Sequence, residues 1–157
     1  ATEKAFQSGR CDAYTTDASG IAAMLVNLPS KADYTVLPDI ISKEPLGPML
    51  RRNDQEFFAI VRWMIFALQQ AEESGVTKAN VAQMKKESKD PAIQRLTGAT
   101  GEVGKGLGLD ADWAVRAIAA VGNFGEIYDR NIKPLGLSRG PNALWNKGGL
   151  MYPMPLD

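Results

Sequence analysis

The sequence predicts a protein of the α/β class, in which a strand–helix–strand order is followed by a mostly helical remainder. Residues 11–16 and 34–37 are short runs rich in β-favouring side chains, and residues 18–27 between them carry apolar residues at helical spacing. Strands that alternate with helices indicate parallel α/β organisation. The 157 residues are enough for one compact domain, or for one lobe with an appended segment.

Asp17 lies at the junction between the first predicted strand and the first predicted helix. The strand, residues 11–16, contains Tyr14 and two threonines, which favour extended backbone. Asp17 ends this strand and is a good N-cap for a helix over 18–27, which Pro29 terminates. Open α/β sheets bind ligands at the edge where a strand ends and a helix begins. Asp17 is therefore either an ordinary helix cap or a ligand-binding residue.

Two more extended segments follow this helix. Residues 34–37 predict a second strand and residues 40–43 predict a third, with a proline break between them. Pro45 and Pro48 then favour extended, edge-like backbone over helix. We expect the chain to enter its second half in an extended conformation.

The sequence of the second half of the chain predicts four helices, and capping residues indicate where some of them start. Asn53 with Glu56 resembles a capping box, and Asp90 with Pro91 forms an N-cap and N1 pair. The first helix has apolar residues on more than one face, so we expect it to be buried on most sides. The expected helices cover 53–74, 77–88, 91–97 and 110–131, a glycine-rich loop covers 98–108, and 132–157 form a covering tail.

The composition excludes several classes of function. The chain has 18 basic and 18 acidic residues, so it lacks the one-sided basic field that nucleic acid or an anionic membrane surface requires. It has no histidine, which excludes Ser-His-Asp and Cys-His catalysis and His-containing zinc sites. Its single cysteine, Cys11, excludes an internal disulfide and a thiolate metal cluster. We expect no cofactor, no metal and no nucleic-acid partner.

Three other features have simple structural explanations. The glycine-rich loop lacks the spacing of a phosphate-binding loop or a dinucleotide fingerprint. Glu102, Asp110 and Asp112 lack the spacing of a calcium loop, so we expect them to cap helices or to be solvated. The three tryptophans lie in apolar surroundings and are expected in the core: Trp63, Trp113 and Trp145.

Five segments resemble the pattern of the periplasmic amino-acid-binding proteins of ABC importers. The first reads Gly-Arg-x-Asp-Ala, three residues, then Asp, and the second is similar to the general L-amino-acid-binding branch of that family. They span nearly the whole chain in the family's order: residues 9–17 (GRCDAYTTD), 37–48 (LPDIISKEPLGP), 122–131 (GNFGEIYDRN), 142–145 (NALW) and 148–152 (GGLMY).

The resemblance implies a type II periplasmic-binding-protein fold, in which two α/β lobes joined by crossing strands close on the ligand by a hinge. This chain resembles only the C-terminal part of such proteins, which are about twice its length. The resemblance therefore implies part of the second lobe over 1–41, the hinge and returning strand over 42–52, a helical segment that packs on the first lobe over 53–131, and the covering tail over 132–157.

The resemblance also implies a function, which is that of the solute-binding component of an amino-acid transporter in the periplasm. Such a protein is no enzyme: it binds an L-amino acid by charge complementarity and hinge closure and delivers it to a membrane permease. Asp17 aligns with the family's acidic residue that accepts hydrogen bonds from the ligand α-ammonium, and such a bond is worth about 1.5–3 kcal/mol. We expect Ser42, Lys43, Glu44 and Pro45 at or near the hinge.

The same resemblance predicts a large exposed apolar face, because the helix over 53–74 would pack on a first lobe that this sequence lacks. An intertwined or swapped homodimer is one arrangement that would cover this face. Cys11 is unpaired in this sequence, and we hypothesise that its partner lies in the absent segment.

Two alternatives from other classes stay open. An enzyme on the same bilobal scaffold, such as a dehydratase, would need a general acid or base, and only Asp17 or Glu44 would serve. A structural piece that has lost ligand binding would keep the fold without the affinity.

Overall fold

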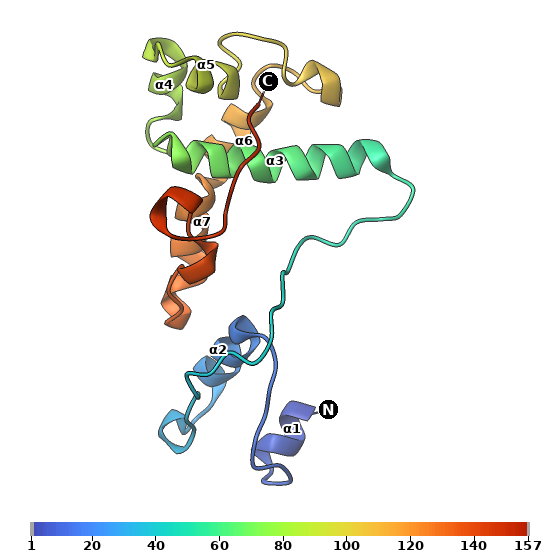
Figure 1. The fold of residues 1–157 in the computed structure, drawn as a ribbon, viewed down its shortest axis with the longest axis vertical. Coiled ribbons are helices and arrows are strands. Elements are labelled where there is room, and N and C mark those ends of the chain that lie inside the picture. Colours follow the sequence, from blue (N-terminus) through green and yellow to red (C-terminus); the bar gives the residue numbers. More distant parts are fainter. Residues whose placement is uncertain (1, 157) are drawn as a thin grey trace.

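The structure, a computed structural model, describes residues 2–156 as two parts joined by an extended linker (Figure 1). The N-terminal part ends near residue 37, and a helical body follows the linker. The elements in chain order are α1 (Thr2–Gln7), α2 (Ala18–Asn27), η1 (Lys31–Asp33), α3 (Gln55–Glu73), α4 (Val81–Glu87), α5 (Pro91–Leu96), η2 (Lys105–Leu107), α6 (Trp113–Val121), α7 (Phe124–Asn131), η3 (Lys133–Leu135), η4 (Gly140–Asn142) and η5 (Trp145–Lys147), where η marks a 3-10 turn.

Aromatic rings hold the small N-terminal part together. The ring of Phe6 on α1 lies 5.8 Å from the ring of Tyr14 and 5.3 Å from that of Tyr34, between centroids. Helix α2 has the bounds that the sequence predicted, and it buries Ala22 and Met24. Contacts between residues far apart in the sequence therefore give this short segment a defined fold.

The three predicted strands are wrong for this chain, because none of them forms within residues 2–156. The segments over 11–16, 34–37 and 40–43 run without regular hydrogen bonding and are mostly exposed. A strand is stabilised by hydrogen bonds to a neighbouring strand, and no described segment pairs with these residues. The one bridge in the described structure is an isolated parallel contact between Leu144 and Met151 in the tail.

Helix α3 is the central element of the helical body. Helices α5, α6 and α7 and the turn η2 contact it, and α4 packs against α5 and α6. Figure 1 shows α4 and α5 on one side of α3 and α7 on the other. The buried core of the body is drawn from α3, α4, α5 and α6, from the segment after α3 and from the tail: Ala67, Ala71, Val76, Val81, Ile93, Leu96, Trp113, Ala114, Ile118 and Leu156.

Two predicted helix starts differ from the observed ones. Helix α3 is capped by Asp54, whose side chain accepts a hydrogen bond from the Phe57 amide over 3.0 Å, so the predicted capping box at Asn53 is wrong. Helix α4 begins at Val81 and not after Thr77. The predicted cap of α5 by Asp90 is confirmed, since its side chain accepts from the Ala92 amide over 2.8 Å.

The single helix predicted over 110–131 is wrong, because two helices occupy this range. Gly122 has a φ of 86°, a backbone conformation that interrupts the helix after α6. Asn123 then starts α7 with a reciprocal capping box: its side chain accepts from the Glu126 amide over 2.9 Å, and its own amide donates to the Glu126 carboxylate over 2.8 Å. Such a box satisfies two amides that a helix start leaves unpaired.

The tail after α7 consists of short turns and buries Leu144 and Leu156. The core placement predicted for the tryptophans is confirmed for Trp113, which is buried, and for Trp63, which packs against the core. It is wrong for Trp145, which is 50% exposed and donates its indole N–H to Glu73 over 2.7 Å.

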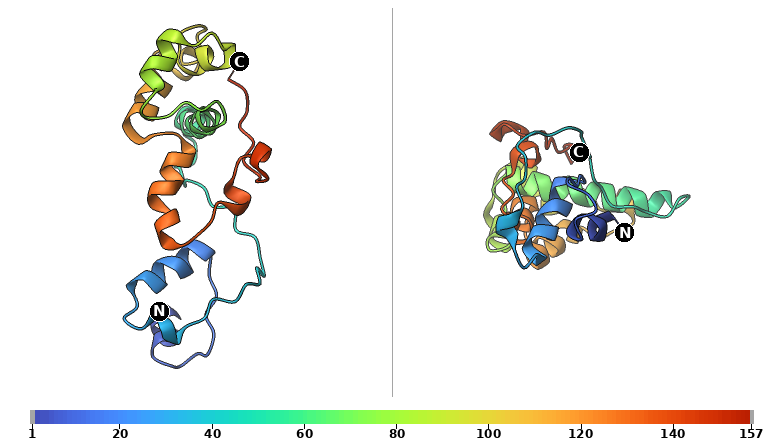
Figure 2. Two further views of the ribbon diagram at one scale, coloured as in Figure 1. Left: turned by 90° about the vertical axis from the view of Figure 1, so that its left-hand side faces the viewer. Right: turned by 90° about the horizontal axis from the view of Figure 1, so that it is seen from below.

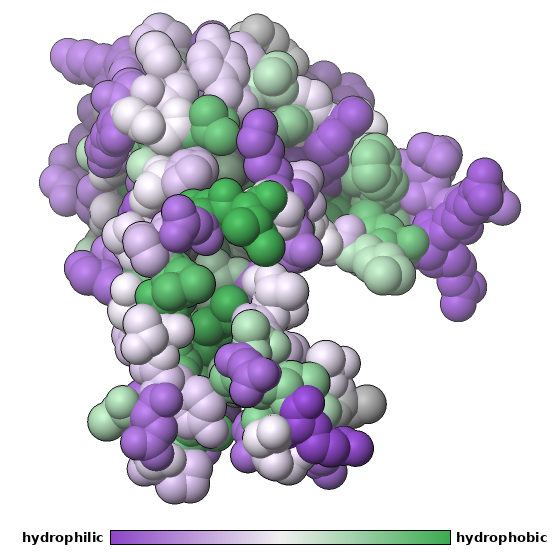
Figure 3. All heavy atoms as spheres, turned by 60° about the horizontal axis from the view of Figure 1, so that its bottom comes forward, coloured by the Kyte–Doolittle hydropathy of each residue, from purple (hydrophilic) through white to green (hydrophobic). Residues whose placement is uncertain are grey.

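The predicted exposed apolar face is present. Met49 in the linker is 97% exposed, and Phe57 and Phe58 at the start of α3 are about half exposed, so this half of α3 is less buried than predicted. Figure 3 shows apolar side chains open to solvent on one face of the molecule. Within the described residues, no helix has the length and apolar character needed to cross a membrane.

Candidate functional site

The candidate binding residue Asp17 is the N-cap of α2. Its backbone is extended, with φ −60° and ψ 151°, which aims the side chain back over the first turn of the helix. The oxygen Oδ1 accepts a hydrogen bond from the Gly20 amide over 2.7 Å and another from the Ser19 hydroxyl over 2.8 Å. No hydrogen bond within the described residues involves Oδ2, so one carboxylate oxygen caps the helix and the other is available.

Gly20 gives this carboxylate the room it occupies. A Cβ atom at position 20 would lie 3.0 Å from Oδ1 of Asp17 and 3.1 Å from the Thr16 methyl carbon. Both distances are tighter than ordinary van der Waals contact. Asp17, Ala18 and Ser19 together are N-cap chemistry in the sequence. The sequence analysis missed Gly20, although a glycine three residues after an aspartate at a helix start is a signal for such an arrangement.

The hydrogen bonds on Oδ1 keep Asp17 ionised. The Gly20 amide, followed by the Ser19 hydroxyl, lowers the pKa of Asp17 below its usual value. An ionised carboxylate only accepts hydrogen bonds, so Oδ2 suits a donor of positive charge such as an ammonium group. Within residues 2–156, no cluster of three or more acidic or thiol side chains suits a metal ion.

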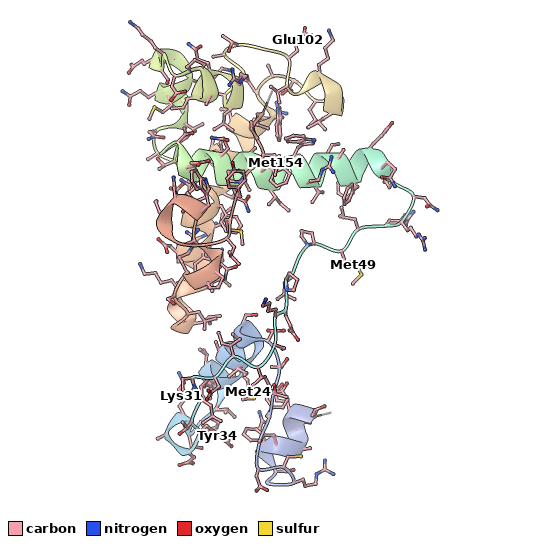
Figure 4. The ribbon with its side chains drawn as sticks, in the orientation of Figure 1. Met24, Lys31, Tyr34, Met49, Glu102 and Met154 are labelled. Carbon is pink, nitrogen blue, oxygen red and sulfur yellow. The ribbon has the colours of Figure 1, made fainter. Side chains whose placement is uncertain are left out.

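The predicted hinge residues Ser42, Lys43, Glu44 and Pro45 lie in the exposed linker (Figure 1). No hydrogen bond or ion pair is found between residues 40 and 50 of the described chain. Figure 4 shows the linker between the two parts, with the Met49 side chain directed away from α3. The structure does not join any of these four residues to Asp17 by a polar contact.

A second polar cluster, which the sequence analysis did not predict, ties the tail to the helical body. The Arg139 guanidinium donates to the Glu72 carboxylate of α3 over 3.0 Å and to the carbonyl of Asn142 over 2.8 Å. It also lies over the rings of Phe124 and Tyr128, 5.6 and 5.0 Å from their centroids. The Glu72 and Arg139 side chains are largely buried, so this ion pair fixes the tail against α3 and α7.

The chain is similar to curated transport proteins over nearly its whole length. It is 51% identical to the glutamate/glutamine/aspartate/asparagine-binding protein BztA of Rhodobacter capsulatus and 49% identical to the general L-amino acid-binding periplasmic protein AapJ of Rhizobium johnstonii. It is 46% identical to the putative amino-acid ABC transporter-binding protein YhdW of Escherichia coli. These alignments cover 97–98% of this chain and 46% of each relative, so the chain spans about half the length of the curated relatives it matches.

The structure is also similar to a solved periplasmic binding protein. The match is an ABC transporter periplasmic binding protein from Brucella ovis with glutathione bound, at a TM-score of 0.92 and 50% identity. It covers 99% of this chain and 50% of the solved chain. The prediction that the chain adopts part of a periplasmic-binding-protein fold is confirmed.

No protein-family model matches the chain. The names of the curated relatives nevertheless describe one class of protein, since each is named as a binding protein for amino acids or of an amino-acid transporter and none is named as an enzyme. The sequence identity of about half extends over nearly the whole chain, and the solved structure agrees with it. The chain is therefore similar to the periplasmic amino-acid-binding proteins of ABC transporters and corresponds to a C-terminal part of them.

Proposed function

We propose that the chain is part of the solute-binding component of an amino-acid ABC importer. It acts in the periplasm, binds an L-amino acid by charge complementarity and hinge closure, and delivers the ligand to a membrane permease. The observation that carries this proposal is the Asp17 carboxylate, whose Oδ1 is held by Gly20 and Ser19 while Oδ2 remains available. No chemical step is required of any side chain.

The chemistry of the relatives' ligands supports a contact to an ammonium group. The names of two relatives specify glutamate, glutamine, aspartate and asparagine, and general L-amino acids. The solved neighbour holds glutathione, whose γ-glutamyl linkage leaves an α-ammonium and an α-carboxylate free. All of these ligands share the α-ammonium, and on our proposal Asp17 binds this common group. Selectivity among side chains then belongs to other residues of the cleft.

We further propose that the chain divides as the sequence analysis expected. Residues 1–41 belong to one lobe, 42–52 form the hinge and returning strand, 53–131 form the helical segment and 132–157 the covering tail. The absence of hydrogen bonds between residues 40 and 50 supports a hinge at Ser42–Pro45, because backbone without internal bonds changes its dihedral angles at low cost. The exposed Glu44 has no polar contact within the described residues, so no observation favours a role for it in acid–base chemistry.

The exposed apolar side chains of the linker and of α3 are covered, on this proposal, by the other lobe of the binding protein. The relatives supply the argument, since this chain accounts for 46% of their length. A swapped homodimer is the competing arrangement. Native mass spectrometry of the chain distinguishes them: a 17.0 kDa monomer that gains no amino-acid mass supports our proposal, and a dimer that gains one ligand per site contradicts it.

Calorimetry on the complete binding protein tests the function. L-Glutamate, L-glutamine, L-aspartate and L-asparagine are titrated into the protein and into its Asp17→Asn variant, with Asp33→Asn as the control because Asp33 is an exposed carboxylate of the same part. We expect at least one of these ligands to bind, with an affinity that falls about 10- to 150-fold in Asp17→Asn and is unchanged in Asp33→Asn. N-acetylation of the best ligand should cause a similar loss. Unchanged binding to Asp17→Asn would contradict the proposal.

A further inference from the structure

The tail of the helical body reaches the helix that starts at Asp17. The turn η3, residues Lys133–Leu135, and helix α2 have Cα atoms within 8 Å of each other. Figure 2 shows the end of α7 and the following turn directly beside α2, and Figure 1 shows the same neighbourhood from another side. Two segments more than a hundred residues apart in sequence therefore join the two parts of the structure, at a place separate from the linker.

The turn η3 is fixed to the helical body on both sides. On its N-terminal side it continues directly from α7, which packs against α3. On its C-terminal side the Tyr128 hydroxyl donates to the carbonyl of Ser138 over 2.8 Å, and Arg139 is paired with Glu72. The turn is thus anchored to the body on both sides of its contact with α2.

Helix α2 has the composition of a helix that is covered on more than one side. None of its ten residues, ASGIAAMLVN, is charged. Ala22 and Met24 are buried, and Ile21 and Leu25 are partly buried. Exposing the apolar side chains of such a helix to water is unfavourable, so the helix is more stable when other parts of the protein cover it. The half-buried Leu135 and the neighbouring Pro134 give η3 an apolar character that suits this surface.

The relative placement of the two parts matches that of a ligand-bound protein. The TM-score of 0.92 is reached over 99% of the chain, so the N-terminal part and the helical body superpose together on the solved neighbour. That neighbour holds glutathione. The contact between α2 and η3 therefore belongs to an arrangement of the parts that is compatible with a bound ligand.

We propose that η3 is a closure latch, a contact of the C-terminal tail with α2 that holds the Asp17-bearing helix against the helical body and favours the closed arrangement of the lobes. This inference rests on the proposed function, because it assigns η3 a role in retaining the ligand. A contact that is stronger in the closed arrangement than in the open one raises the ratio of closed to open molecules. Its loss lowers the apparent affinity by the factor by which it lowers that ratio.

The first test needs no ligand. Hydrogen–deuterium exchange of the α2 amides is measured in the chain, in Leu135→Asp and in the control Leu150→Asp, which places the same change on a leucine that is 77% exposed. We expect exchange across α2 to accelerate about tenfold in Leu135→Asp and to be unchanged in the control. A second variant, in which residues 133–135 are replaced by Gly-Ser-Gly, should behave as Leu135→Asp. Unchanged exchange in both η3 variants overturns the latch.

The second test measures ligand release from the complete binding protein by stopped flow. The Gly-Ser-Gly variant should raise the dissociation rate about tenfold, and Leu135→Met, which preserves the apolar contact, should leave it unchanged. If the protein binds no amino acid, the proposed function fails. The exchange experiment still shows whether η3 protects α2. If ligand binds and the variant releases it at the normal rate, the latch is overturned and the proposed function stands.

Discussion

The Gly20 amide donates a hydrogen bond to Oδ1 of Asp17 over 2.7 Å, and this bond leaves Oδ2 as the oxygen that can bind a ligand. It satisfies one of the amides that the start of α2 leaves unpaired. It also orients the side chain, so that binding a ligand through Oδ2 requires no further ordering of Asp17. A helix cap and a ligand contact are thus compatible in one residue.

Two substitutions of Asp17 should distinguish its role as a helix cap from its role in ligand binding. Asp17→Ala removes the cap and should lower the free energy of unfolding by about 1 kcal/mol, whereas Asp17→Asn should stay close to the wild type because Asn is an equally good N-cap. Urea denaturation followed by circular dichroism measures both. Equal destabilisation by the two variants would show that the charge of Asp17, and not its cap, stabilises α2.

Gly20→Ala should weaken ligand binding without destabilising the protein. The added methyl would lie 3.0 Å from Oδ1 and push the carboxylate from its position, while alanine within a helix gains about 0.5–1 kcal/mol over glycine. Calorimetry and thermal unfolding give the two quantities. Gly47→Ala is the control, because nothing lies within 4 Å of a Cβ at that position. Full affinity in Gly20→Ala would show that the position of Oδ1 does not matter for the ligand.

Stability should fall in acid below the ordinary pKa of an aspartate. The hydrogen bond from the Gly20 amide, followed by that from the Ser19 hydroxyl, lowers the pKa of Asp17, and the hydrogen bond from Arg116 lowers the pKa of Asp110, both from 3.8. A carboxyl with a lowered folded pKa contributes stability that is present above its unfolded pKa and is lost as the pH falls through the folded value. Denaturant unfolding between pH 5 and 2 should therefore show a weaker pH dependence in Asp110→Asn. An identical slope would contradict this assignment.

Gly125→Ala should loosen the tail from the helical body. A Cβ at position 125 would lie 2.9 Å from the Glu72 carboxyl carbon and 3.2 Å from Nη1 of Arg139, so it would disturb their ion pair. We expect a loss of about 1–3 kcal/mol in the free energy of unfolding. Gly106→Ala is the matched control, since nothing lies within 4 Å of its added methyl. Equal stability of the two variants would show that the ion pair accommodates the methyl.

Local signals in the sequence were sufficient for some elements. The bounds of α2 follow from a capping aspartate, apolar spacing and a terminating proline, all between Asp17 and Pro29. The break between α6 and α7 was missed because the helical spacing over 110–131 outweighed Gly122, although Asn123 with Glu126 carries the capping-box pattern.

Features that depend on distant partners could not be read from the sequence. The strands predicted over 11–16 and 34–37 have the right residues, but a strand needs a neighbour and the described chain provides none. The Glu72–Arg139 ion pair joins residues 67 positions apart, and neither residue is distinctive by itself. Asp17 was identified as a candidate site through family resemblance. The structure was needed to show that Oδ1 caps α2 while Oδ2 is available.

A crystal structure of the complete binding protein with its best amino-acid ligand tests the central claim most directly. The quantity of interest is the distance between the ligand α-ammonium nitrogen and Oδ2 of Asp17. We predict a charge-assisted hydrogen bond of about 2.7–2.9 Å, with Oδ1 still accepting from Gly20 and Ser19. A ligand whose ammonium group is bound by other residues, with Asp17 serving as a helix cap alone, would contradict the account.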